Sequence, residues 1–211
     1  MRITAAILCV LAAAAVAGAS STMLDVYDST DLTNPFGTIQ SIATAQTGTQ
    51  HYNYFSVSGH PSNVNLGTYN SSVWIHENTN NGEYTFGFIF SMDNSADGNN
   101  DAVINFRIVG SDSDVYVSQS DDPGEAVEIA PGTFQGSFHY GWNTDGIAVS
   151  GITGTDWTVI IDSVDFGDIE EWYAASGETA DYTDDLALTL GSEYRITLSD
   201  NEEGPSDANV G

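Results

Sequence analysis

The strongest constraint on the fold is a two-residue alternation of apolar and polar side chains that runs through most of the chain. It is clearest from Glu83 to Met92, where one set of alternate positions holds Tyr84, Phe86, Phe88, Phe90 and Met92. Successive side chains of a β-strand point to opposite faces, so these residues share one face. The opposite face also contains Ile89. The segment therefore predicts an inner strand of a sandwich, buried on at least one face.

Similar segments recur at roughly ten-residue spacing, separated by Gly-, Asn- and Asp-rich turns. Ala102–Val109 places Ile104, Phe106 and Ile108 inward with Asn105 and Arg107 outward. Trp157–Ile161 is apolar on both sides apart from Thr158, as in a central strand. Asp168–Ala175 fits a short helix or a strand equally well. Further expected strands are Gln40–Ala45, Tyr52–Val57, Ser72–Glu77, Val115–Gln119, Ala126–Ile129, Thr133–Tyr140, Gly146–Val149, Leu186–Leu190 and Tyr194–Leu198. This pattern predicts an all-β protein with a single β-sandwich or jelly-roll domain.

The chain begins with the features of a secretory signal peptide. Arg2 precedes an apolar run from Ile3 to Val16, and Ala17-Gly18-Ala19 matches a cleavage site. We therefore expect residues 1–19 to be a cleaved signal peptide, 20–199 the sandwich domain and 200–211 a flexible acidic tail. Cys9 lies inside the apolar run, so removal of this leader would leave no cysteine for disulfides or thiolate chemistry.

Charge restricts the partners of such a protein. The chain has no lysine and contains 30 Asp and Glu against 3 basic residues, for a formal net charge of -27. Such a surface repels nucleic acid and anionic membranes and attracts cations. Neither nucleic acid nor a membrane is an expected partner. Adaptation of a secreted, halotolerant protein to saline media accounts for the same composition without a specific site.

The best local candidate for a metal site is the acidic segment from Asp93 to Asp101, which has the length of a hairpin loop. Asp93, Asp97, Asn99 and Asp101 offer the hard oxygen ligands that Ca²⁺ prefers. The spacing is not that of an EF-hand, and a solvated Asn/Asp turn is the alternative. Further acidic clusters that folding could bring into a site are Asp112/Asp114, Asp121/Asp122/Glu125 and Asp181/Asp184/Asp185.

No catalytic motif stands out, so we expect no enzyme activity. G-x-S-x-G, phosphate-loop and dinucleotide fingerprints are missing, and the 4 histidines form no HxH or HExxH spacing. A glycosidase would need two carboxyl groups across a sugar-binding cleft. Exposed aromatic rings would instead serve a carbohydrate-binding module, with Trp74, Trp142 and Trp172 as candidates. Packing in the core is the alternative for each ring.

Several motifs between Val115 and Leu190 resemble those of a family of exported bacterial proteins. They are Asp121-Asp122-Pro123-Gly124-Glu125, Trp142-Asn143-Thr144-Asp145-Gly146, Gly154-Thr155-Asp156-Trp157 with the strand after it, and Glu171-Trp172. The chain is similar here to secreted β-sandwich proteins that often end in a PEP-CTERM sorting signal. The sequence lacks that tail, which implies free release or self-assembly. The resemblance implies an association with matrix or biofilm and supplies no catalytic residues.

These observations lead to three hypotheses. The first is a secreted, acidic sandwich that acts by binding or assembly, as a Ca²⁺-stabilised component of an extracellular matrix or filament. The second is a carbohydrate-binding module with extracellular glycans as partners. The third is an enzyme similar to glycoside hydrolases.

Overall fold

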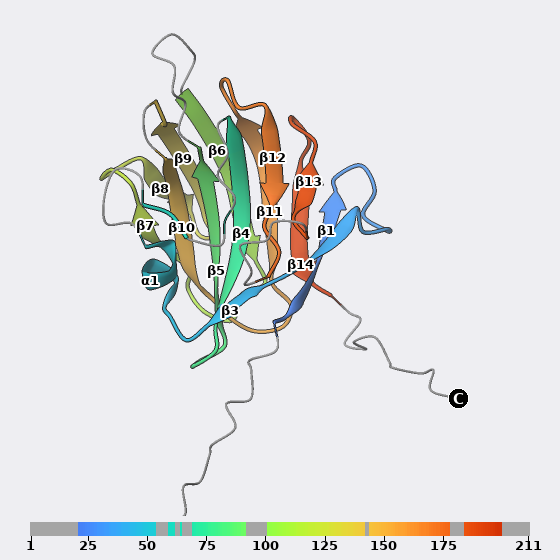
Figure 1. The fold of residues 1–211 in the computed structure, drawn as a ribbon. Coiled ribbons are helices and arrows are strands. Elements are labelled where there is room, and N and C mark those ends of the chain that lie inside the picture. Colours follow the sequence, from blue (N-terminus) through green and yellow to red (C-terminus); the bar gives the residue numbers. More distant parts are fainter. Residues whose placement is uncertain are drawn as a thin grey trace, which may run out of the picture.

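Two β-sheets packed face to face form the protein (Figure 1). The computed structural model describes residues 21–53, 59–61, 64, 69–91, 101–141, 144–177 and 184–199. The predicted all-β sandwich is confirmed. Most neighbouring strands are antiparallel, as is usual when one face of each sheet packs on a core and the other faces outward.

The first sheet, sheet A, contains the first and last of the described strands side by side near one edge. Its strand order is β2 (Gly37–Gln40), β1 (Met23–Asp28), β14 (Tyr194–Leu198), β11 (Thr158–Asp165), β6 (Asp101–Val109), β9 (Thr133–His139) and β8 (Ala126–Ala130). The predicted strand Trp157–Ile161 corresponds to β11, which lies in the interior of the sheet as expected.

The second sheet, sheet B, is built around the long strand β4. Its order is β13 (Leu186–Leu188), β12 (Glu171–Ala174), β4 (Asn70–Asn78), β5 (Glu83–Phe90), β10 (Asp145–Ile152) and β7 (Tyr116–Ser120). A further strand, β3 (Ile42–Thr44), pairs in parallel with the second half of β4, while β12 pairs in parallel with the first half. The inner position predicted for Glu83–Met92 is confirmed for β5, which lies between β4 and β10.

Aromatic rings dominate the core between the sheets. Phe86, Phe88 and Phe90 of β5 are fully buried, as their shared face predicted. Phe106 of β6 packs between Phe86 and Phe134, with ring centroids 4.9 and 5.2 Å away. Burial of each large apolar side chain contributes about 1.5–3 kcal/mol. Together with the buried Leu, Val and Ile side chains of the same cluster, this layer of rings supplies the apolar attraction that holds the two sheets together.

A smaller apolar cluster lies on the opposite face of sheet B, under the short helix α1 (Gly48–Tyr52). A reciprocal capping box between Thr47 and Gln50 begins the helix, and Asn53 ends it in the left-handed conformation. The helix packs against β10, β4, β7 and β5. Sheet B is thus covered on both faces in this region, with the aromatic core on one side and α1 on the other (Figure 1).

Three expected elements differ in the structure. The predicted strand Tyr52–Val57 is wrong at Tyr52, which belongs to α1, and residues 54–58 lie outside the described part. Gln40–Ala45 is not one strand, because the chain passes from β2 in sheet A to β3 in sheet B at Ser41. For Asp168–Ala175 the strand alternative is correct, since β12 pairs with β4 and β13.

The segment between β5 and β6 is not a hairpin connection. β5 belongs to sheet B and β6 to sheet A, so this segment joins the two sheets. The predicted metal ligands Asp93, Asp97 and Asn99 lie on it, outside the described residues, whereas Asp101 is the first residue of β6.

Replacement of Gly87 by Ala tests the packing of the cluster under α1. A Cβ at Gly87 would lie 2.0 Å from Cε2 and Cζ2 of Trp74, whose ring is completely buried. We expect Gly87→Ala to lower the free energy of unfolding by about 1–3 kcal/mol, because a buried ring must move. Gly37→Ala is the matched control, since its Cβ would meet only the end of the Leu186 side chain. Equal urea midpoints for the two variants would contradict this packing.

Candidate functional site

The strongest candidate site is a group of carboxylates at one end of the sandwich, around Asp145 at the start of β10. Asp145 is 2% exposed. Its Oδ2 accepts a hydrogen bond from the backbone N–H of His139 (3.0 Å), and its Oδ1 accepts one from the N–H of Gly146 (2.9 Å). Two strands, β9 and β10, therefore hold this carboxyl group in one orientation.

The turn between β7 and β8 places two further acids near Asp145. Glu125 closes this turn, because its Oε2 accepts a hydrogen bond from the backbone N–H of Asp122 (2.7 Å). Glu125 is also hydrogen-bonded with the Asp145 side chain, and Asp121 acts electrostatically on both. Burial, followed by the charges of Asp122 and Asp121, raises the pKa of Glu125.

The same surroundings change the ionisation of Asp145 strongly. Burial, followed by the charges of Glu125 and Asp121, raises the pKa of Asp145 from 3.8 to about 8. The two backbone N–H donors oppose this change, because they favour the carboxylate. Asp145 and Glu125 therefore form a coupled pair that retains a proton at a pH where an ordinary carboxyl group has lost it.

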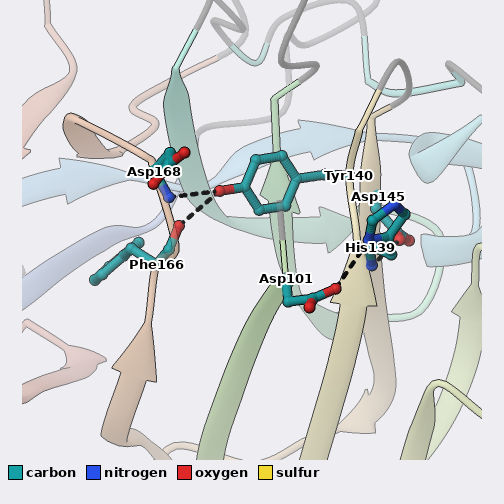
Figure 2. Close-up of polar contacts among 6 residues, drawn as sticks. All are labelled: Asp101, His139, Tyr140, Asp145, Phe166 and Asp168. Atoms are coloured by element: carbon teal, nitrogen blue, oxygen red, sulfur yellow. Dashed lines mark hydrogen bonds and ion pairs between the residues drawn. The ribbon is translucent and has the colours of Figure 1, made fainter. Parts of the chain in front are cut away.

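Asp101 and His139 form an exposed pair beside this group (Figure 2). Asp101 Oδ1 lies 2.8 Å from His139 Nδ1, and the two residues are direct partners in the register of β6 and β9. The same His139 donates its backbone N–H to Asp145. Asp101 is the last residue of the acidic segment 93–101 and the first of β6. It is therefore paired with the residue of β9 whose backbone binds the buried Asp145 carboxylate.

Tyr140 anchors this end of the sandwich (Figure 2). Its hydroxyl donates to the backbone carbonyl of Phe166 (2.8 Å) and accepts from the N–H of Asp168 (3.0 Å). Its buried ring stacks on Phe90 with centroids 5.6 Å apart. The chain just after β9 is thereby tied to the turn after β11, which keeps the backbone next to His139 in place.

The chemistry available here is that of hard oxygen donors. Asp145, Glu125 and Asp121 carry the oxygen atoms that Ca²⁺ takes as ligands. Within the described residues, no three His, Cys, Asp or Glu side chains are grouped closely enough to hold a metal ion by themselves. A cation at this end of the sandwich would therefore need further oxygens from backbone carbonyls, water or neighbouring segments.

The tryptophans considered for sugar binding lie elsewhere. Trp74 is 0% exposed and packs beneath α1, and Trp172 is 1% exposed and contacts Phe88, Phe166 and Tyr194 in the core. Neither ring forms an exposed platform. The two rings lie on opposite faces of sheet B, and apolar side chains cover both faces there. Trp142 lies outside the described residues.

Among the acidic clusters noted in the sequence, Asp121/Asp122/Glu125 gains a buried partner on folding. That partner is Asp145, which the local sequence did not single out. A signal was present, since Asp145 stands directly before the apolar strand segment Gly146–Val149. An aspartate at the start of a strand is common, so its position alone does not indicate a site. The pairing with Glu125 depends on a turn that is distant in the sequence.

The two arginines of the described residues lie in one row across sheet A. Ile160 of β11 is paired with Arg107 of β6 on one side and with Arg195 of β14 on the other. Arg107 makes a bidentate ion pair with Asp162 at 2.7 Å, with side chains 43% and 37% exposed. An exposed pair of this kind contributes at most about 1 kcal/mol. The positive charge is thus concentrated on one face, away from the carboxylate group at Asp145.

Comparison of the chain with protein-family models, with curated proteins and with solved structures finds no match. In the described part of the chain, no helix has both the length and the apolar character needed to cross a membrane.

The raised pKa of Asp145 predicts a specific pH dependence of stability in the presence of a chelator. Between pH 4 and 8 the folded state binds more protons at Asp145 than the unfolded state does, so this group lowers stability as the pH rises through that range. Asp145→Asn removes this contribution. We therefore expect the stability of the variant relative to wild type to increase by a few kcal/mol from pH 5 to pH 8 and to be constant above that range.

Urea unfolding at several pH values measures this difference. Asp114→Asn, at an exposed position, is the control and should follow the wild-type curve. Parallel curves for Asp145→Asn and wild type would show that Asp145 ionises normally.

Proposed function

We propose that this chain is a secreted, acidic β-sandwich protein that acts by binding or assembly, with Ca²⁺ as the ion that stabilises it. The observation that carries the proposal is the burial of Asp145 against Glu125 and Asp121 in a protein of net charge -27. At neutral pH this arrangement retains a proton or requires a positive charge nearby. In extracellular fluid, Ca²⁺ is the cation whose ligand preference fits carboxylate oxygens.

The acidic segment 93–101 extends this proposal. It ends at Asp101, which contacts His139 beside the Asp145 group. Asp93, Asp97 and Asn99 would add oxygen ligands to those of Asp145 and Glu125, and so bring the total toward the six to eight that Ca²⁺ takes.

Assembly follows from the same electrostatics. Copies with a net charge of -27 repel one another, and divalent cations reduce this repulsion by binding and by screening. The signal-peptide pattern at residues 1–19 and the resemblance to PEP-CTERM-associated sandwich proteins support an extracellular place of action. We accordingly favour a component of an extracellular matrix or filament.

The two other hypotheses have less support. A carbohydrate-binding module would need exposed rings, and Trp74 and Trp172 are both buried. A glycosidase needs two carboxyl groups about 5–10 Å apart across an open cleft. Asp145 and Glu125 are instead hydrogen-bonded to each other, and Asp145 is almost fully covered.

Calcium addition provides the direct test. With Ca²⁺ at about 100 times its dissociation constant, the folded state gains about 2.7 kcal/mol, which raises the melting temperature by roughly 5–10 °C. We expect this rise for wild type and for Asp114→Asn, and its loss in the double variant Asp145→Asn/Glu125→Gln. Calorimetry in CaCl₂ and in NaCl of matched ionic strength separates site binding from screening. An equal rise in both salts would overturn the calcium site and indicate salt adaptation.

Assembly of several copies is tested by the size of the protein in solution. Size-exclusion chromatography with light scattering should give larger species in CaCl₂ than in chelator, because a bound cation lowers the repulsion between copies. Asp145→Asn/Glu125→Gln should elute as wild type does in chelator. A monomer under all conditions, together with a calcium-dependent melting temperature, would retain the ion site and remove assembly.

A further inference from the structure

A pair of buried histidines holds α1 against the outer face of sheet B. His51 of α1 stacks on His76 of β4 with ring centroids 4.4 Å apart and an angle of 15° between the rings. His51 also packs edge-on against Trp74, at 5.2 Å. The two histidines are 6% and 0% exposed. This contact is therefore part of the interior and not a surface pair.

The hydrogen bonds of the two rings suit only their neutral forms. His76 Nε2 lies 2.8 Å from Thr44 Oγ1, while His76 Nδ1 and His51 Nε2 have no hydrogen-bond partner within the described structure. A charged imidazolium donates from both nitrogens. Protonation of either ring would therefore bury a cation with an unpaired N–H next to a second ring, which is costly in an apolar interior.

No carboxylate of the surrounding strands, among the described residues, compensates such a charge. Glu77 of β4 accepts hydrogen bonds from Thr22 and Ser41, and Glu83 of β5 accepts one from the N–H of Gly151. The other titratable groups on the strands packed against α1 are Tyr84, Tyr116 and Asp145. None of these groups raises the pKa of either histidine. Burial, followed by the charge of His76, lowers the pKa of His51 to about 3, and burial lowers the pKa of His76 to about 4.

We propose that His51 and His76 form an acid-sensitive latch, which keeps α1 docked while both rings are neutral and releases it when either ring is protonated. Release of α1 uncovers Trp74 and Tyr52, which belong to the apolar cluster on this face. The main core between the sheets is separate from this cluster and contains neither histidine, so the sandwich itself persists when the latch opens.

The direction of the pH effect follows from the neutral resting state. In the unfolded chain these histidines bind protons near pH 6.5, whereas in the folded protein they do so only at lower pH. The docking energy of α1 is thus fully present above pH 6.5 and decreases as the pH falls toward 4. This direction is opposite to that of Asp145, so the two groups can be separated by experiment.

Hydrogen exchange of the amides in 48–53, followed by mass spectrometry and corrected for the intrinsic pH dependence of exchange, tests the latch. Between pH 6.5 and 4, wild-type α1 should lose at least roughly tenfold in protection relative to β11, because a histidine pKa that is lower by one in the docked state changes the docking equilibrium about tenfold. The double variant His51→Phe/His76→Gln keeps an aromatic ring on Trp74 and a hydrogen-bond partner for Thr44, but has no titrating group in the latch. Its α1 should keep its protection to within about twofold over the same range.

His60→Gln serves as the matched control, because its Nδ1 contacts the carbonyl of Pro61 and the ring lies outside the stacked pair. In the His60→Gln variant, α1 should lose its protection at the same pH as in wild type. Should the larger ring not fit, His51→Leu/His76→Gln provides the same comparison. Opening of α1 at one pH in wild type and both double variants would overturn the latch and assign the effect to the carboxylates. Constant protection of wild-type α1 would also overturn it. All variants retain Asp145 and Glu125, so these outcomes do not depend on calcium binding.

Discussion

The fold depends on the apolar attraction between two sheets across a layer of aromatic rings. The described residues contain no cysteine, and their Arg107–Asp162 pair is exposed and contributes little. Against this stands the mutual repulsion of an excess of carboxylates. The buried core, with the stacked and tilted rings of Phe86, Phe106 and Phe134 within it, must therefore supply the stability that disulfides or ion pairs supply in many other proteins. Such an attraction does not require positive charge, which suits a chain without lysine.

Two pairs of titratable side chains that include buried groups are exceptions to this apolar design, and they lie at separate places. One is the carboxyl pair of Asp145 and Glu125 at the end of the sandwich, and the other is the stacked pair of His51 and His76 beneath α1. Both pairs avoid charge in the interior, the first by retaining a proton and the second by releasing one. Their effects on stability have opposite dependences on pH.

The carboxyl pair of Asp145 and Glu125 lies at a point where parts of both sheets meet. It lies where β9, β10 and the turn between β7 and β8 meet, so an ion bound there would join parts of both sheets. Tyr140 fixes the adjoining backbone through its bonds to Phe166 and Asp168 (Figure 2). A cation proposed at this place would act on β9 and β10, which belong to different sheets. That is why we expect its binding to appear in global unfolding.

Local alternation of side chains determined most of the strands in advance. The strands β4 to β9 and β14 coincide closely with predicted segments, because a strand between a core and an outer face must alternate. The strands β10 and β11 were also predicted, but both extend past the predicted C-terminal end. The sequence did not indicate β1, and the capping box that begins α1 is too short a signal to outweigh a strand-like pattern. The break at Ser41 also escaped prediction, since a change of sheet leaves the alternation almost intact.

The sequence by itself therefore determined the class of fold, the acidity and the identity of the core strands, which are properties of residues close together in the chain. Tertiary structure alone decided that Asp145 meets Glu125, that His51 meets His76 and that Trp74 and Trp172 are both covered. Each of these contacts joins residues of different strands or turns. Their chemistry arises from burial, which depends on what packs above a side chain and not on its neighbours in the sequence.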